Sequence, residues 1–154
     1  KYGLDTCKTS DCLTKNYVSH RDEIDQRLVY LSASKAKYTI LLFWDVDCGH
    51  CKKEVPVVFE SFQALRKEGI DVKVHAVYTQ HELQKWIKTL KEMKLIDPYW
   101  KNVVDGVHFQ NLKEVFDIYS TPVIYLLDEK GVIRYKRIGA EQISEIIHQL
   151  EKVK

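Results

Sequence analysis

Residues 38–56 read YTILLFWDVDCGHCKKEVP, and this stretch decides the fold. Residues 38–44 are apolar, aromatic or β-branched, which is typical of a central strand buried on both faces. A helix is predicted from near Gly49 to Gly69, because apolar residues then recur at helical spacing: Val55, Val58, Phe59, Phe62 and Leu65. Cys48 and Cys51 therefore stand where a buried strand runs into a helix.

Strand and helix patterns alternate through the middle of the chain. Residues 71–78 predict a strand, and residues 81–94 predict an amphipathic helix because apolar side chains recur at i, i+3, i+4 and i+7. Residues 96–109 are aromatic and predict irregular structure, and residues 112–119 predict a short helix. Strand–helix–strand units imply parallel strands joined by right-handed crossovers.

The C-terminal part predicts a hairpin followed by a helix. Residues 122–127 and 132–138 predict two strands, and Gly131 lies in the turn between them, where a left-handed backbone is often required. This pair of strands is expected to be antiparallel. A stripe of isoleucine and leucine predicts the final helix over residues 143–150.

A single α/β domain is predicted over residues 1–154, with a central mixed sheet flanked by helices. The length suits one domain, and a composition that is 45% hydrophobic supplies a sizeable core. Residues 1–37 are expected to form an N-terminal extension, with a helix over residues 17–32 where apolar residues form a loose stripe. Residues 38–152 are expected to form the core of the domain.

Charge and hydropathy restrict the partners. The net charge is +2 and the basic residues are spread along the chain, whereas a nucleic-acid interface needs them clustered, so no nucleic-acid partner is expected. No apolar run approaches the ~20 residues of a membrane span, so membrane contact is expected only through an anchor since removed. The chain opens on Lys1 rather than methionine, so the absence of a signal segment from it does not argue against export.

The four cysteines form two close pairs, Cys7 with Cys12 and Cys48 with Cys51. An even number of cysteines in local pairs favours an oxidising compartment. Cys7 and Cys12 lie in a polar segment, and we expect either a local disulfide or two free thiols there. A relay of electrons to Cys48 is the alternative for this first pair.

The position of Cys48 at a helix start favours a reactive thiolate. The attacking species in disulfide exchange is the thiolate, and a free thiol has a pKa of roughly 8.5. Unpaired N–H groups and the positive end of the helix dipole lower that pKa. Cys48 is therefore predicted to attack a substrate disulfide, and Cys51, one turn later, to resolve the mixed disulfide.

Residues around the pair are expected to tune it. A protonated His50 would stabilise the Cys48 thiolate, and Gly49 completes the motif between the two cysteines. Compared with a proline at the His50 position, this predicts a more oxidising pair. Asp45 and Asp47 would act in the opposite direction if they lie close, since like charges disfavour the thiolate.

Glu54 is the candidate for proton transfer. It lies one helical turn past Cys51, where a carboxyl group can take a proton from that thiol, or return one, during resolution. The alternative is a solvated carboxylate on the helix surface.

A C-x-x-C motif also has uses outside redox chemistry. It can be half of a zinc site, and Cys7 with Cys12 would then supply the other two ligands. It can also form a purely structural disulfide. A buried strand that runs into a helix is the context of redox motifs rather than of zinc-binding turns, so no metal is expected.

Residues 43–56 (FWDVDCGHCKKEVP), with Thr121-Pro122 much later in the chain, resemble the thioredoxin superfamily and look most like its secreted bacterial TlpA/ResA-like branch. The resemblance covers residues 38–152. It implies a thioredoxin fold, thiol–disulfide oxidoreductase activity and an exported, periplasmic location.

The resemblance also implies roles for residues outside the cysteine motif. Pro122 is expected in cis, and the backbone of Thr121 is expected to pair with the substrate chain. Pro56 matches the proline that kinks the active-site helix of the family, and Glu54 matches an acidic residue of the TlpA/ResA-like branch. Trp44 is a candidate substrate-binding residue together with Thr121 and Pro122, although a tryptophan at this place is more often part of the core.

Three positions depart from the thioredoxin pattern. Leu42 stands where thioredoxins carry a buried aspartate, so proton handling by that aspartate is excluded and Glu54 is the expected substitute. Asp47 replaces the tryptophan before the first cysteine, which predicts a more polar and acidic docking surface. The Gly49-His50 pair resembles protein disulfide isomerase domains, which leaves the direction of electron flow open.

The expected function is disulfide exchange with protein substrates in the reductive direction, with electrons from an unidentified upstream donor. No cofactor is expected beyond the redox-active Cys48–Cys51 disulfide. Disulfide isomerase or oxidase activity is the first alternative. A peroxiredoxin is the second, although its usual P-x-x-x-[ST]-x-x-C pattern is missing before Cys48. The third is a thioredoxin-fold binding module with a structural disulfide.

Overall fold

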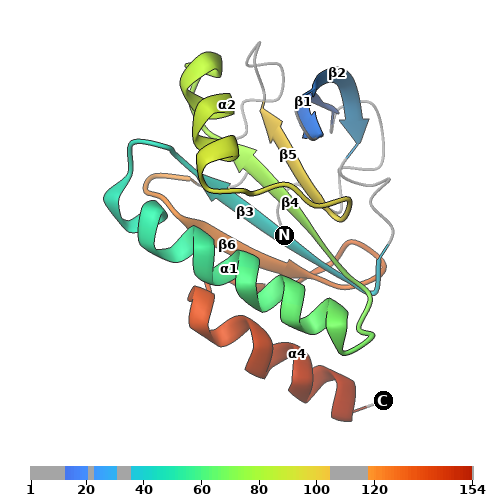
Figure 1. Ribbon diagram of the computed structural model, residues 1–154. Coiled ribbons are helices and arrows are strands. Elements are labelled where there is room, and N and C mark those ends of the chain that lie inside the picture. Colours follow the sequence, from blue (N-terminus) through green and yellow to red (C-terminus); the bar gives the residue numbers. More distant parts are fainter. Residues whose placement is uncertain (1–12, 21–22, 31–35, 105–117, 154) are drawn as a thin grey trace.

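A mixed β-sheet forms the centre of the molecule (Figure 1). The computed structural model describes residues 13–20, 23–30, 36–104 and 118–153. Within these residues the sheet has five strands in the order β5–β4–β3–β6–β7, with β3 to β5 parallel and β6 and β7 antiparallel to their neighbours. The strands are β3 (Tyr38–Trp44), β4 (Val72–Tyr78), β5 (Trp100–Val104), β6 (Val123–Leu127) and β7 (Ile133–Lys136).

The described α-helices pack against one face of this sheet. They are α1 (Gly49–Lys67), α2 (Leu83–Glu92) and α4 (Ile143–Lys152), and the short 3-10 helix η3 (Ala140–Gln142) leads into α4. Helices α1 and α4 lie side by side (Figure 1). Side chains from all three helices, including Phe62, Trp86 and Ile147, join one hydrophobic core with the strands. None of the described helices has the length and apolar character needed to cross a membrane.

Strand β3 is buried along its whole length, as its apolar composition predicts. Its side chains alternate, so Ile40, Leu42 and Trp44 join the core beneath the helices, whereas Leu41 and Phe43 belong to a second apolar cluster on the opposite face. Each fully buried side chain of this kind contributes roughly 1.5–3 kcal/mol to stability. The strand that leads into the cysteine motif is therefore anchored on both faces of the sheet.

The predicted α/β core is confirmed in its main elements. The helix predicted from Gly49 is α1, which contains Pro56. It ends before Gly69, whose φ is 85°. The strand predicted over residues 71–78 is β4, and the helix predicted over residues 81–94 is α2. The predicted antiparallel hairpin is the β6–β7 pair, and Gly131 in its turn has a φ of 80°.

The helix predicted over residues 17–32 is wrong. The described residues there form an antiparallel pair of strands, β1 (Leu13–His20) and β2 (Glu23–Tyr30), in register from Leu13↔Tyr30 to His20↔Glu23. Ile24, Leu28 and Tyr30 are separated by multiples of two, which also fits a strand. A loose stripe that fits both the helical period and the strand period does not discriminate between a helix and a strand. The N-terminal extension is therefore a β-hairpin where it is described.

The irregular structure predicted over residues 96–109 is wrong in part, since residues 100–104 form strand β5. The Trp100 ring lies against Phe59 and Phe62, with ring centroids 5.0 and 5.8 Å apart. Asn102 interrupts the apolar pattern of this strand, but it is buried and hydrogen-bonded on both sides. The short helix predicted over residues 112–119 falls almost wholly outside the described residues.

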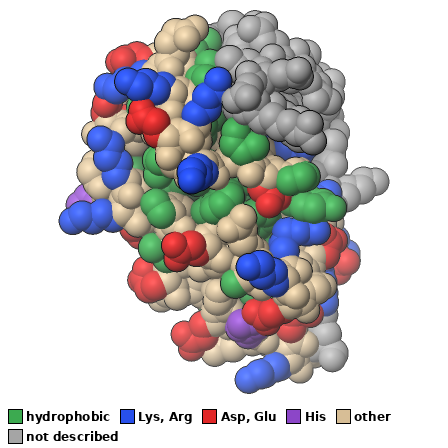
Figure 2. All heavy atoms as spheres, in the orientation of Figure 1, with side chains coloured by type: hydrophobic (Ala, Val, Ile, Leu, Met, Phe, Trp, Pro, Cys, Tyr) green, Lys and Arg blue, Asp and Glu red, His purple; other side chains and the backbone are tan. Residues whose placement is uncertain are grey.

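Charges of both signs mix on the face of the molecule shown in Figure 2. Lysine and arginine side chains alternate there with aspartate and glutamate, and apolar side chains lie between them. On this face the basic residues are not gathered into one patch.

Candidate active site

The cysteine motif sits at the junction that the sequence predicts, directly after β3 and at the start of α1. Cys48 is the N-cap residue of α1, with an extended backbone at φ −87° and ψ 121°. Its N–H donates to the Asp45 carbonyl oxygen at 3.3 Å, which closes the turn that links strand to helix. Its side chain is partly exposed. The sulfur of Cys48 thus lies where unpaired helix N–H groups can stabilise a negative charge.

Hydrogen bonds hold the Cys48 sulfur in this position. The backbone N–H of Cys51 donates to it at 3.2 Å. Burial raises the pKa of Cys48, but hydrogen bonds from the Cys51 and Thr121 side chains, and from the N–H groups of Cys51 and His50, outweigh it and lower the pKa. Cys48 is therefore the better nucleophile of the two near neutral pH.

Cys51 differs from Cys48 in both exposure and acidity. Its side chain is completely buried in the core beneath α1. Burial, followed by the hydrogen bond with Cys48, raises the pKa of Cys51 to about 12. Both cysteines are free thiols in this structure. The pair therefore combines an accessible, acidic sulfur with a protected sulfur that keeps its proton.

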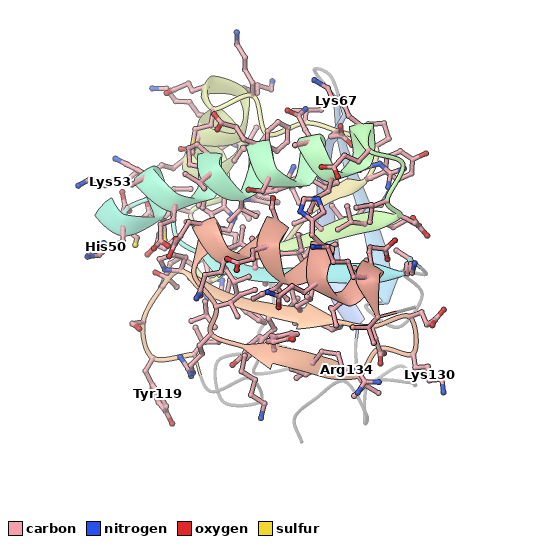
Figure 3. The ribbon with its side chains drawn as sticks, turned by 90° about the horizontal axis from the view of Figure 1, so that it is seen from below. His50, Lys53, Lys67, Tyr119, Lys130 and Arg134 are labelled. Carbon is pink, nitrogen blue, oxygen red and sulfur yellow. The ribbon has the colours of Figure 1, made fainter. Side chains whose placement is uncertain are left out.

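The second half of the site comes from the loop before β6. The Thr121-Pro122 peptide bond is cis, as the family resemblance implies. The Cys48 thiol donates to the Thr121 carbonyl oxygen at 3.3 Å, although the two residues are 73 positions apart in the chain. In Figure 3, Tyr119 of this loop lies at the same end of the molecule as His50 and Lys53, opposite Lys130 and Arg134. The sheet thus brings the two expected halves of the site together.

Charged side chains flank the motif. His50 and Lys53 are exposed at the start of α1 (Figure 3). Asp47, also exposed, forms an ion pair with Lys85 of α2. The sequence alone assigns no role to Lys85. Exposed charged residues follow no regular spacing along the chain, and this ion pair joins two segments that are distant in the sequence.

Glu54 lies where the sequence places it, one turn along α1 from Cys51, and is half-buried. Within the described residues no hydrogen bond or ion pair holds its carboxylate. Trp44 is 0% exposed, so its indole is a core residue and offers no surface to a substrate. The prediction of a substrate contact by this side chain is therefore wrong. Leu42 is also fully buried in place of the thioredoxin aspartate.

No three or more histidine, cysteine, aspartate or glutamate side chains gather into a metal-binding group within the part of the chain that the structure describes. The zinc alternative requires Cys7 and Cys12, and both lie outside the described residues. The local disulfide and the relay considered for these two cysteines also fall there.

Comparison with known proteins then places the chain. The model of the AhpC/TSA family matches residues 15–136. The chain belongs to the AhpC/TSA family. This AhpC/TSA protein is 33% identical over 116 residues to Sporulation thiol-disulfide oxidoreductase A of Bacillus subtilis, covering 73% of this chain and 67% of that protein. It is 22% identical over 134 residues to the thiol-disulfide oxidoreductase ResA of Bacillus cereus, covering 85% of this chain and 72% of that protein.

A solved structure supports the same assignment. The domain of a possible thiol-disulfide isomerase from Cytophaga hutchinsonii shares 34% identity with a TM-score of 0.76, covering 92% of this chain and 94% of that one. The family, the relatives and the fold confirm the expected resemblance. The protein is a thioredoxin-like thiol–disulfide oxidoreductase of the AhpC/TSA family.

Proposed function

We propose that this AhpC/TSA protein exchanges disulfides with protein substrates through the Cys48–Cys51 pair, with net reduction of the substrate. The observation that carries the proposal is the asymmetry of the two sulfurs. Cys48 is partly exposed with a lowered pKa, whereas Cys51 is fully buried with a pKa raised to about 12. That division suits one attacking and one resolving sulfur.

The reaction proceeds in two balanced steps. The Cys48 thiolate attacks one sulfur of a substrate disulfide, which forms the mixed disulfide and releases the other substrate sulfur as a thiolate that takes up a proton. The Cys51 thiol then loses its proton and attacks the Cys48 sulfur. This step forms the Cys48–Cys51 disulfide and frees the second substrate thiol. Two electrons pass to the substrate, and a dithiol donor upstream restores the reduced pair.

Glu54 accepts the proton of Cys51 in the second step. Cys51 cannot attack while it is protonated, and its raised pKa makes that deprotonation the difficult event. Glu54 is half-buried, lies one turn away on the same helix and has no competing partner among the described residues. Proton transfer takes place in the mixed disulfide, directly or through one water.

The backbone of Thr121 aligns the substrate. Its carbonyl oxygen is already within hydrogen-bond distance of the Cys48 sulfur, so an extended chain that pairs with this loop carries its own cysteine to the nucleophile. Asp47 and Lys85 form the neighbouring rim, which makes this docking surface polar.

The direction of exchange depends on the potential of the pair. A lowered Cys48 pKa stabilises the dithiol form, and this moves the pair toward the oxidising range. Isomerase or oxidase activity is therefore the alternative to net reduction.

Replacing Cys51 with serine tests the mechanism. The C51S variant should accumulate mixed disulfides with substrate proteins through Cys48, because the resolving sulfur is gone. The C48S variant, incubated with the same substrates, should form none. If C51S forms no adduct with any disulfide-containing protein, the mechanism fails. Rapid consumption of hydrogen peroxide by the wild type would instead support a peroxidase.

We also place the protein outside the cytoplasm, in the periplasm or another exported compartment, on the strength of its cysteine pairs and its likeness to the TlpA/ResA-like branch. Fractionation of cells that express the gene from its native start tests this. Recovery with the periplasmic or membrane fraction is expected, and recovery in the cytosol would contradict it.

A further inference from the structure

Lys85 of α2 reaches the residue that directly precedes the nucleophile. Its ammonium group forms an ion pair with the Asp47 carboxylate, and Asp47 is the chain neighbour of Cys48. Both side chains are about half exposed, at 48% and 50%. Nothing in the disulfide chemistry itself requires this contact, so its position at the residue that precedes the attacking cysteine invites a physical explanation.

Asp47 is fixed on its side of the ion pair. Its backbone N–H donates to a carboxylate oxygen of Asp45 at 3.0 Å. The N–H of Cys48 donates to the backbone carbonyl oxygen of the same Asp45, so both bonds belong to one turn. The backbone of Asp47 therefore has a defined place directly before Cys48.

Lys85 is fixed on the other side by the core. The next residue, Trp86, is fully buried, and its ring stacks on Tyr78 with centroids 5.6 Å apart and planes 5° from parallel. Tyr78 pairs with Trp44 at the end of β3, and the N–H of Thr79 donates to the Trp44 carbonyl oxygen at 3.0 Å. The first turn of α2 is thus anchored to the strand end from which the Cys48 loop departs.

The environment of this ion pair is acidic. The pKa of Lys85 is raised, first by its hydrogen bond with Asp47, and then by the charges of Asp47, Glu82 and Asp45. The same three carboxylates add to the effect of burial in raising the pKa of Tyr78 to about 12. Among the described residues, Cys48 receives hydrogen bonds from Cys51, His50 and Thr121. Asp45 and Asp47 precede it in the chain, and these two carboxylates with Glu82 are the charges that act on Lys85 and Tyr78.

We propose that Lys85 is a positioning residue for the nucleophile, which neutralises Asp47 and holds its carboxylate in place so that an acidic flank does not suppress the Cys48 thiolate. A carboxylate beside a thiol disfavours ionisation of that thiol, and a cation in contact with the carboxylate cancels most of its field. The inference deepens the proposed function, because it concerns the reactivity of the same sulfur.

A thermodynamic cycle tests the inference without any substrate. The pH dependence of iodoacetamide alkylation at Cys48, read by peptide mass, gives the pKa of Cys48 in the reduced protein. K85M should raise it by about half a unit, a threefold loss of thiolate near neutral pH, as expected for one exposed charge. In the D47N background Lys85 has lost the partner that holds it near the motif, so the K85M change should produce a clearly smaller shift. K85R keeps the charge and should restore the wild-type value.

Lys88 provides the matched control. It lies on the same helix and faces Glu92 rather than the motif, so K88M should leave the pKa of Cys48 unchanged. Salt at ~1 M should shrink the K85M shift, because the Debye length falls to about 3 Å. An unchanged pKa in K85M, or an equal shift in the D47N background, would overturn the inference. Failure of the wild type to exchange disulfides would instead count against the proposed function, and the alkylation cycle would still report on Lys85.

Discussion

The Cys48 sulfur lies 3.3 Å from the backbone carbonyl oxygen of Thr121, and this contact joins the two halves of the active site. Cys48 lies between the end of β3 and the start of α1, whereas Thr121 lies in the loop that precedes β6. Strands β3 and β6 are antiparallel neighbours, so the end of one lies beside the start of the other. The sheet topology therefore aligns the nucleophile with the backbone proposed to receive the substrate.

The two thiols should differ in their reactivity with iodoacetamide as the pH is varied. A thiol reacts as its thiolate, so the lowered pKa of Cys48 predicts that its alkylation reaches half of the maximal rate at a lower pH than that of a free cysteine thiol. Cys51 is buried with a pKa of about 12 and should remain unmodified throughout this range. Peptide mass mapping after short pulses across a pH series measures both. Equal labelling of the two cysteines at pH 7 would contradict the assigned roles.

Replacing Glu54 with glutamine should slow resolution and leave the attack intact. The amide keeps the size of the side chain but cannot accept a proton from Cys51, so decay of a preformed mixed disulfide should slow by at least about tenfold. Alkylation of Cys48 should be unchanged. The control is E60Q, which alters an exposed glutamate of the same helix. Equal decay rates in E54Q and the wild type would remove Glu54 from the mechanism.

Asn102 should be important for stability rather than for exchange. Its side-chain oxygen accepts from the Trp100 indole N–H at 2.8 Å, and its amide donates to the Leu95 carbonyl oxygen at 2.8 Å. Replacement by alanine leaves these buried groups unpaired and creates a small cavity, which should cost about 2–4 kcal/mol. Urea unfolding measures the loss. A change below about 1 kcal/mol would show that the surroundings relax or that water replaces the amide.

Asp128 should stabilise the β6–β7 turn in a pH-dependent way. Burial raises the pKa of Asp128, but N–H groups of Val132 and Lys130, together with Arg134, lower it by more. A carboxyl group with a depressed pKa in the folded state contributes stability above its ordinary value of about 3.9, and this contribution is lost as the pH falls through the folded value.

The D128N variant isolates that contribution. Because the Arg134 side chain is exposed and screened by solvent, D128N should cost only about 0.5–1 kcal/mol at pH 7. The difference from the wild type should shrink in urea unfolding as the pH is lowered through the depressed folded-state pKa of Asp128. The neighbouring E129Q is the control. A loss that stays constant over the whole acid range would mean that geometry, not charge, is responsible.

The sequence predicts the part of the fold that carries the chemistry. Residues 38–44 are apolar without interruption, and the helix behind them repeats its apolar residues over several turns, so tertiary packing and local pattern agree. The expected closeness of Cys48 and Thr121 depends on the family resemblance. Nothing in the local pattern places two residues 73 positions apart beside each other.

The sequence-based predictions are wrong where the local hydrophobic pattern is weak, or where a polar residue is buried in the core with its hydrogen bonds formed. The apolar residues of 17–32 are sparse enough to fit a helix or a strand. In β5, the polar Asn102 interrupts the apolar pattern that would predict a buried strand. Its hydrogen bonds to Trp100 and Leu95 make its burial possible, and they form only in the folded protein. The ion pair of Asp47 with Lys85 leaves no trace in the sequence, since exposed charges follow no period.

The most direct test of the central proposal is a redox titration of the Cys48–Cys51 pair. The protein is equilibrated in dithiothreitol and glutathione buffers of known potential, its thiols are trapped by alkylation, and each cysteine is mapped by mass. If the protein reduces its substrates, Cys48 and Cys51 should be oxidised together as a two-electron couple with a reduction potential of about −270 mV. A couple near −180 mV or above would contradict the reductive direction in favour of isomerase or oxidase activity. A pair that never exchanges would contradict the redox function itself.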